Sequence, residues 1–233
     1  MRIIISTTGE CIRKAAAAIS EIIKRKPNAT LGLATGSTMI PLYRELVRLY
    51  KKGEIDFSRV RTFNLDEYAD LSFNDKNSYH RYMNRNFFNK VNIKKLNVHF
   101  PASKGDEYEK EIKNSGGLDL VLLGIGTNGH IAFNEPGSSF NSRTRKIKLS
   151  DSTIKSNSRF FTSARRVPEE AYTMGIKTIM RSRKIILLAF GTKKSNAVLR
   201  AIKGPITEKI PASVLRQHKD ATFILDRKAA AQL

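Results

Sequence analysis

The chain has 233 residues, 40% of them hydrophobic, which is enough for one large domain with a sizeable core. It carries 42 lysines and arginines against 21 aspartates and glutamates, a net charge of +21 at pH 7. Its apolar runs are too short for a membrane span or a signal peptide, so we expect a soluble, cytoplasmic protein without a membrane anchor. Cys11 is the single cysteine, which excludes an internal disulfide, and we expect it to be buried on a helix.

The high positive charge should attract anionic ligands, and it raises the question of nucleic-acid binding. The basic residues occur as scattered pairs and triplets rather than as one stripe, and aromatic residues do not alternate with them. We therefore interpret most of them as solvated surface charges and expect no nucleic-acid partner.

Short apolar segments alternate with segments of helical periodicity along the chain. Strands are predicted at residues 2–6, 30–34, 60–65, 97–100, 118–124, 184–190 and 221–225. Helices are predicted at residues 12–26, 40–52, 78–88, 107–114 and 195–202. This alternation predicts an α/β fold, and the continuous apolar runs at 118–123 and 185–189 are typical of strands buried in a mainly parallel sheet.

No repeat or linker divides the chain. We therefore expect residues 1–233 to form a single domain, with a mainly parallel open sheet flanked by helices on both faces in a modified Rossmann-like arrangement. The polar stretch 137–151 is predicted to be a functional loop. Residues 228–233 have no pattern of their own, and we assign them no function.

The first candidate site follows the predicted strand 30–34, where Thr35-Gly36-Ser37-Thr38 precedes a helix. Free backbone N–H groups, hydroxyls and a positive helix N-terminus are what a phosphate group needs. The segment lacks the lysine and the spacing of a nucleotide-binding P-loop. A tight turn with a helix cap explains these residues equally well.

The second candidate site is the adjacent pair Asp66 and Glu67, which follows a predicted buried strand. Open α/β sheets keep their sites at such strand ends. Taken alone, helix capping by Asp66 is a slightly better interpretation of this pair.

The third candidate site is the segment 123–136, which follows the predicted strand 118–124 and presents His130 and Glu135 on a loop with three glycines. Histidine can accept and return a proton near neutral pH, and a carboxylate can fix its tautomer. The other histidines, His80, His99 and His218, stand isolated, so we expect neither a metal site nor another cofactor.

Several cations could bind a phosphate group: Arg143, Arg145, Arg159 and Lys194. In a chain with 42 basic residues, sequence position alone does not choose among them.

Five motifs taken together resemble the glucosamine-6-phosphate deaminase family, in its short-chain branch. They lie at residues 35–38, 63–68, 126–136, 142–145 and 157–161. The resemblance extends from about residue 30 to the C-terminus, and its middle motif is long and specific.

The resemblance implies an enzyme of amino-sugar catabolism that converts glucosamine 6-phosphate and water to fructose 6-phosphate and ammonia. Asp66 matches the base that moves a proton from C2 to C1, and His130 matches the group that opens the sugar ring, with Asn128 and Glu135 orienting it. The residues that match substrate-binding positions are Thr35, Gly36, Ser37, Thr38, Glu67, Gly129, Arg159 and Lys194.

This sequence departs from the family pattern in two places. Asn128 stands where many longer-chain members have aspartate, and because an amide carries no charge we expect an altered pH dependence. Ser138 and Arg145 match the N-acetylglucosamine-6-phosphate effector site of the hexameric branch, but Ile147 stands where that branch has lysine. This substitution puts allostery and hexamer formation in doubt, so we expect a monomer or a small homo-oligomer.

Two alternatives remain. A 6-phosphogluconolactonase resembles this fold and binds a sugar phosphate beside a Gly-His loop, but its loop lacks the Phe-Asn-Glu-Pro found here at 133–136. A non-catalytic sugar-phosphate sensor of the bacterial-regulator type would need a helix-turn-helix, and no segment is left for one.

Overall fold

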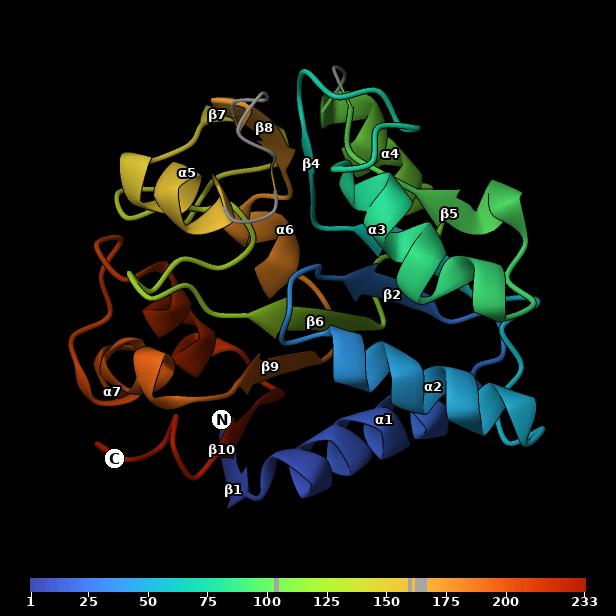
Figure 1. Ribbon diagram of the computed structural model, residues 1–233, viewed down its shortest axis with the longest axis horizontal. Coiled ribbons are helices and arrows are strands. Elements are labelled where there is room, and N and C mark those ends of the chain that lie inside the picture. Colours follow the sequence, from blue (N-terminus) through green and yellow to red (C-terminus); the bar gives the residue numbers. More distant parts are fainter. Residues whose placement is uncertain (103–104, 159–160, 162–166) are drawn as a thin grey trace.

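The computed structural model describes residues 1–102, 105–158, 161 and 167–233. A seven-stranded sheet forms its centre, with helices flanking it (Figure 1). The seven strands are β1 (Arg2–Ser6), β2 (Thr30–Leu33), β3 (Arg61–Asn64), β5 (Val98–His99), β6 (Leu120–Gly124), β9 (Ile185–Ala189) and β10 (Ala221–Asp226). They pair in parallel in the order β1-β10-β9-β6-β2-β3-β5, which confirms the predicted α/β fold.

Burial follows from the position of each strand in this sheet. Every residue of β2, β9 and β10 is buried, and this explains the continuous apolar runs in the sequence. Strand β1 lies at the edge of the sheet and leaves Ile3 and Ile5 exposed. The core therefore lies around the inner strands and the helices packed on them.

Helices α1 (Thr8–Arg25) and α2 (Ile40–Lys51) pack side by side (Figure 1). Helix α1 begins before its predicted start because Thr7 and Glu10 form a reciprocal capping box. Cys11 is fully buried on α1, as expected. The remaining predicted helices are present as α3 (Tyr79–Asn86), α4 (Gly105–Asn114) and α7 (Ser195–Lys203). In the described ranges, 3₁₀ helices lie at Phe88–Lys90, Lys95–Asn97, Thr192–Lys194 and Pro211–Gln217.

A second, three-stranded antiparallel sheet was not predicted. It consists of β4 (Asp66–Tyr68), β8 (Glu170–Thr173) and β7 (Arg145–Lys148), in that order. Strand β7 lies within the stretch 137–151, so the prediction of a loop there was wrong in part. Helices α5 (Asp151–Asn157) and α6 (Ile176–Met180) complete this region. It has a small core of its own, formed by Tyr68, Phe133, Leu149, Val167 and Ala171.

The two sheets are joined at the residue between β3 and β4. The N–H of Leu65 donates to Leu33 O of the large sheet at 3.1 Å, and Leu65 O accepts from the N–H of Met174, just past β8, at 2.6 Å. The small sheet therefore begins where the large sheet ends. None of the helices in the described ranges combines the length and the apolar character that a membrane crossing requires.

Candidate active site

The candidate site lies where the connections of the large sheet diverge. From β2 the chain continues to β3 on one side, whereas β6 is followed by β9 and β10 on the other side. Because all these strands are parallel, their carboxyl ends border a crevice of the kind that binds ligands in open α/β sheets. A pocket of 670 Å³ occupies this position, which is large enough for a small metabolite.

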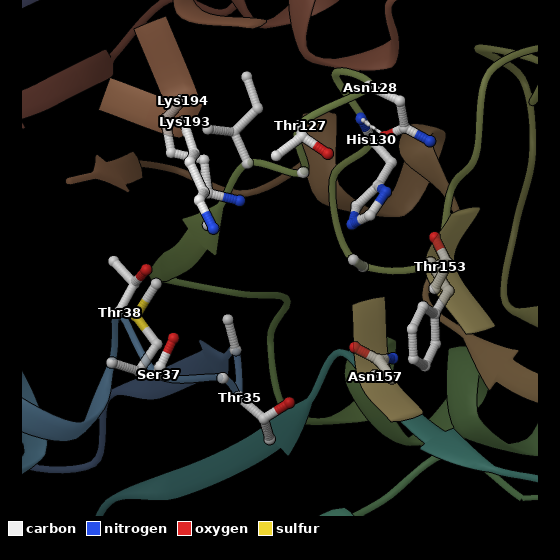
Figure 2. Close-up of a pocket in the computed structure, with 18 of the residues that line it drawn as sticks. Thr35, Ser37, Thr38, Thr127, Asn128, His130, Thr153, Asn157, Lys193 and Lys194 are labelled. Atoms are coloured by element: carbon white, nitrogen blue, oxygen red, sulfur yellow. Dashed lines mark hydrogen bonds between the residues drawn. The ribbon is translucent and has the colours of Figure 1, made fainter. Parts of the chain in front are cut away.

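One side of the pocket combines the loop after β2 with two lysines. Thr35, Gly36, Ser37 and Thr38 line it, and Lys193 and Lys194 line it from the loop after β9 (Figure 2). Gly36 has a φ of 99°, a backbone conformation that favours glycine. Hydroxyls, the start of α2 and two ammonium groups together form a suitable site for a phosphate group.

Two tyrosines hold the loop after β2 in place. Tyr43 of α2 donates its hydroxyl hydrogen to Ala34 O, and Tyr82 of α3 donates to Gly36 O at 2.7 Å. Both bonds use backbone carbonyls, so they fix the path of the chain and leave the side chains of Ser37 and Thr38 for a ligand. The loop is therefore held from two helices.

Asp66, the first residue of β4, lies in the pocket wall but is only 6% exposed. Within the described part of the chain, its Oδ1 atom has no hydrogen-bond partner. Burial, together with the nearby charge of Glu67, raises the pKa of Asp66 to about 8. A carboxyl group with such a pKa can both give and take a proton near neutral pH.

The carboxylate of Glu67 is bound by backbone N–H groups. It accepts backbone N–H bonds from Tyr68, Tyr79 and His80 at 2.9, 2.9 and 2.8 Å. Burial raises the pKa of Glu67, and these N–H groups oppose the rise. Two of the donors belong to the first turn of α3, so Glu67 caps that helix. The capping role that we considered for Asp66 was therefore wrong, and Glu67 is better explained as this cap than as a substrate ligand.

His130 lies on the loop after β6, with its ring packed directly against Gly126. A Cβ atom at Gly126 would overlap the imidazole ring. His130 Nδ1 lies 3.5 Å from Glu135 Oε2, which is within ion-pair distance, although Nδ1 makes no hydrogen bond to the described residues. The ring borders the pocket (Figure 2). Because the carboxylate is at Nδ1, Nε2 remains as the nitrogen for a ligand.

Asn128 and Thr153 fix the carboxylate of Glu135. Asn128 Nδ2 donates to Glu135 Oε2 at 2.8 Å, while Asn128 Oδ1 accepts from the backbone N–H of His130 at 3.2 Å. Thr153 donates its hydroxyl hydrogen to Glu135 Oε1. Burial opposes the ionisation of Glu135, but His130, Thr153 and Asn128 lower its pKa to about 2. Glu135 is thus a permanent anion beside a histidine.

Most of the residues expected from the sequence come together here. Eight line the pocket: Thr35, Gly36, Ser37, Thr38, Asp66, Asn128, His130 and Lys194. Glu135 stands behind His130. Gly129, with a φ of 90°, packs against Ile210 and, like Glu67, is not among the described lining residues. Arg159 lies outside the described residues.

The other proposed cations lie elsewhere. Arg143 and Arg145 are not among the described lining residues, and Arg145 donates to Asn134 Oδ1 at 3.0 Å. In the described ranges, His, Cys, Asp and Glu side chains form no group of three that could hold a metal ion.

Sequence analysis missed several residues of the pocket wall: Tyr79, Phe133, Thr153, Lys155, Asn157 and Lys193. Three of them belong to α5, whose residues before Asn157 carry no recognisable motif. Lys193 could have been found as the neighbour of Lys194. Phe133 and Asn157 lie within motifs of the family pattern, but nothing in the sequence assigns them to the pocket.

Comparison with known proteins gives a consistent result. A family model described as glucosamine-6-phosphate isomerases/6-phosphogluconolactonase matches residues 6–224. A glucosamine-6-phosphate deaminase from Thermoanaerobacter sp. (strain X514) is 50% identical over 99% of this chain and 94% of its own length.

Solved structures agree with this match. The structure of a monomeric glucosamine-6-phosphate deaminase superimposes with a TM-score of 0.97 at 43% identity and covers 100% of both chains. A 6-phosphogluconolactonase from Trypanosoma cruzi has a TM-score of 0.78 at 23% identity, covering 100% of this chain and 96% of that one. At that identity, the second likeness concerns the fold alone.

Proposed function

Because this chain belongs to the family of glucosamine-6-phosphate isomerases and 6-phosphogluconolactonases, we propose that it is a glucosamine-6-phosphate deaminase. The observation that supports this activity most is the presence of two acid–base groups in one pocket. Asp66 has its pKa raised to about 8, whereas His130, which lines the same pocket, lies beside Glu135, a carboxylate whose pKa is about 2. Opposite shifts of this kind mark groups with different roles in proton transfer.

The reaction uses these groups in sequence. The phosphate group binds at 35–38 and at Lys194, with Lys193 beside it. His130 Nε2 takes the proton from the O1 hydroxyl and passes it to O5 as the C1–O5 bond breaks, which leaves an open-chain aldehyde. Asp66, once ionised, removes the proton from C2 that this aldehyde acidifies and returns one to C1. Water then adds to the imine carbon at C2, and ammonia leaves.

A lactonase activity is the second candidate, because the family includes both enzymes. Hydrolysis of a lactone requires activation of one water molecule and no carbon-bound proton transfer. A buried carboxyl group such as Asp66, in the same pocket as a separate His130–Glu135 pair, suits the deaminase better. The high identity to named deaminases also favours it.

An assay of ammonia and fructose 6-phosphate formed from glucosamine 6-phosphate tests the proposal. We expect equal amounts of both products, unaffected by a metal chelator. The Asp66→Asn variant should bind the sugar phosphate but release no ammonia. Hydrolysis of 6-phosphogluconolactone without ammonia release from the amino sugar would reject the proposal in favour of the lactonase.

We further propose that residues 1–233 act as one domain and as a monomer in the cytoplasm, where sugar phosphates are formed and consumed. The pairing of β1 with β10 links the two ends of the chain in one sheet and supports a single domain. The monomeric description of the similar solved deaminase supports the assembly state. N-acetylglucosamine 6-phosphate is expected to leave the rate unchanged, because Ile147 replaces the lysine of the effector site.

A further inference from the structure

Thr153 contacts the His130–Glu135 pair from an element that the sequence did not associate with it. It lies on α5, is 3% exposed, and donates its hydroxyl hydrogen to a residue 18 positions earlier in the chain. We propose that Thr153 is a positioning residue for ring opening, which fixes Glu135 and, through it, the tautomer of His130. This inference rests on the proposed function, because ring opening is one of its steps.

The direction of the Thr153 hydroxyl is set by its neighbours. The Ser150 hydroxyl donates to Thr153 Oγ1 at 3.2 Å, so the single hydroxyl hydrogen of Thr153 remains for Glu135. Ser150 also caps α5, since its Oγ accepts the backbone N–H of Thr153 at 3.3 Å. The start of α5 therefore holds both the backbone and the side chain of Thr153.

The two oxygens of Glu135 are held by different partners. Oε1 accepts from Thr153, whereas Oε2 accepts from Asn128 at 2.8 Å and lies 3.5 Å from His130 Nδ1. The last torsion of a glutamate side chain is soft, so one held oxygen alone does not fix the carboxylate plane. Removing the Thr153 hydroxyl would leave Oε1 without this donor and allow the carboxylate to turn from His130.

This rotation of the Glu135 carboxylate would change which nitrogen of His130 carries the proton. A carboxylate beside Nδ1 favours the tautomer with hydrogen on Nδ1 and leaves Nε2 as the acceptor that faces the pocket. A neutral imidazole without such a partner places its hydrogen mainly on Nε2. A protonated Nε2 cannot take the proton from the O1 hydroxyl, so ring opening would slow while the chemistry of Asp66 remains intact.

Three variants separate this role from a structural one. Thr153→Val keeps the shape and removes the donor, and Thr153→Ser keeps the donor. Thr178→Val is a matched control, because Thr178 is also buried and donates to a glutamate, Glu109 Oε1, at 2.6 Å, outside the described pocket lining.

Two measurements are made on each protein. Nitrogen-15 chemical shifts of the His130 ring, recorded without substrate above the pH at which it protonates, report the tautomer. Steady-state rates with glucosamine 6-phosphate and its C2-deuterated form report kcat/KM and its isotope effect. The isotope effect is large only where C2 proton removal limits the rate.

We expect Thr153→Val to place part of the hydrogen on Nε2 and to lower kcat/KM by about 10- to 100-fold, the usual effect of losing a partner that orients a functional histidine. Its isotope effect should fall toward one, because ring opening becomes limiting. Thr153→Ser and Thr178→Val should resemble the parent protein in tautomer and isotope effect.

An unchanged tautomer in folded Thr153→Val, or an isotope effect that stays constant or grows, would overturn the role of Thr153. If Thr153→Val does not fold, Thr153→Ala removes the same donor without adding bulk, and the same two outcomes apply. If the parent protein releases no ammonia, the proposed function fails, whereas the tautomer measurement still decides whether Thr153 positions His130.

Discussion

Asp66 and Glu135 are both acidic residues on segments that follow buried strands, yet their surroundings shift their pKa values in opposite directions. Asp66 is buried beside another carboxylate, and among the described residues nothing donates to its Oδ1 atom. Glu135 is partly buried, but it accepts from Asn128 and Thr153 and lies beside His130. Hydrogen-bond donors from distant parts of the chain therefore decide which carboxyl group has a raised pKa and which stays ionised.

Replacing Asp66 should remove part of the pH dependence of stability. The folded pKa of about 8 lies above the unfolded value of about 3.9, so the stabilising contribution is complete below about pH 4 and is lost as pH rises toward 8. Asparagine does not titrate. The free energy of unfolding of Asp66→Asn minus that of the parent should therefore rise by about 3 kcal/mol from pH 5 to pH 7. Urea unfolding at both pH values measures this change. If the free energies of unfolding of the variant and the parent differ by the same amount at pH 5 and pH 7, the pKa of Asp66 is not raised in the folded protein.

Asn128→Asp is expected to make activity more sensitive to pH. Asn128 Nδ2 donates to Glu135 at 2.8 Å, and an aspartate would place a second carboxylate oxygen at this position. While it holds a proton it can still donate; once ionised it repels Glu135. The ratio of its kcat/KM to that of the parent should fall as pH rises from about 5 to 8. Asn128→Ala removes the donor without adding charge, so its ratio should stay constant, and parallel profiles for both variants would contradict the argument.

At the scale of elements, the long apolar strands were predictable and the short polar ones were not. Runs such as Ile185–Ala189 are buried along their whole length, and a short continuous apolar run of this kind predicts a buried strand. Strand β7, with the sequence Arg-Lys-Ile-Lys, has one partly buried hydrophobic residue, Ile147, and pairs with β8 more than twenty residues later. Local periodicity contains no information about such a partner. For the same reason, the sequence did not predict that residues of α5 line the pocket.

Helix α3 supports the loop at residues 35–38, the proposed phosphate-binding loop, and this support can be measured. Tyr82→Phe removes the bond to Gly36 O, which is 2.7 Å long in the parent protein. A lost hydrogen bond of about 1 kcal/mol corresponds to an increase in KM of about fivefold, with kcat less affected because Asp66 and His130 are untouched. Tyr50→Phe on α2 is the control, since Tyr50 packs against the main core outside the described pocket lining. Equal KM values for Tyr82→Phe and the parent would show that the loop needs no support from α3.

At the scale of the whole molecule, the charge of +21 should act on the encounter with an anionic substrate. Raising KCl from about 0.05 M to 0.5 M shortens the screening length to less than half, so kcat/KM should fall several-fold while kcat changes little. The measurement is a series of initial rates at constant pH, with sucrose at matched osmolality as the control. A kcat/KM that does not respond to KCl would restrict the role of the charge to the lysines of the pocket.

The pairing of β1 with β10 has a consequence for biosynthesis. Within the described residues β1 has β10 as its sole partner, and the register joins Arg2 to Thr222 and Ser6 to Asp226. A ribosome completes Ile3 to Ile5 long before it reaches residue 221, so the nascent strand must wait in an unpaired, apolar state. Contacts between such distant segments also slow folding. Strand β1 therefore stays unpaired until residues 221–226 have been synthesised, and we expect it to depend on chaperones during that interval.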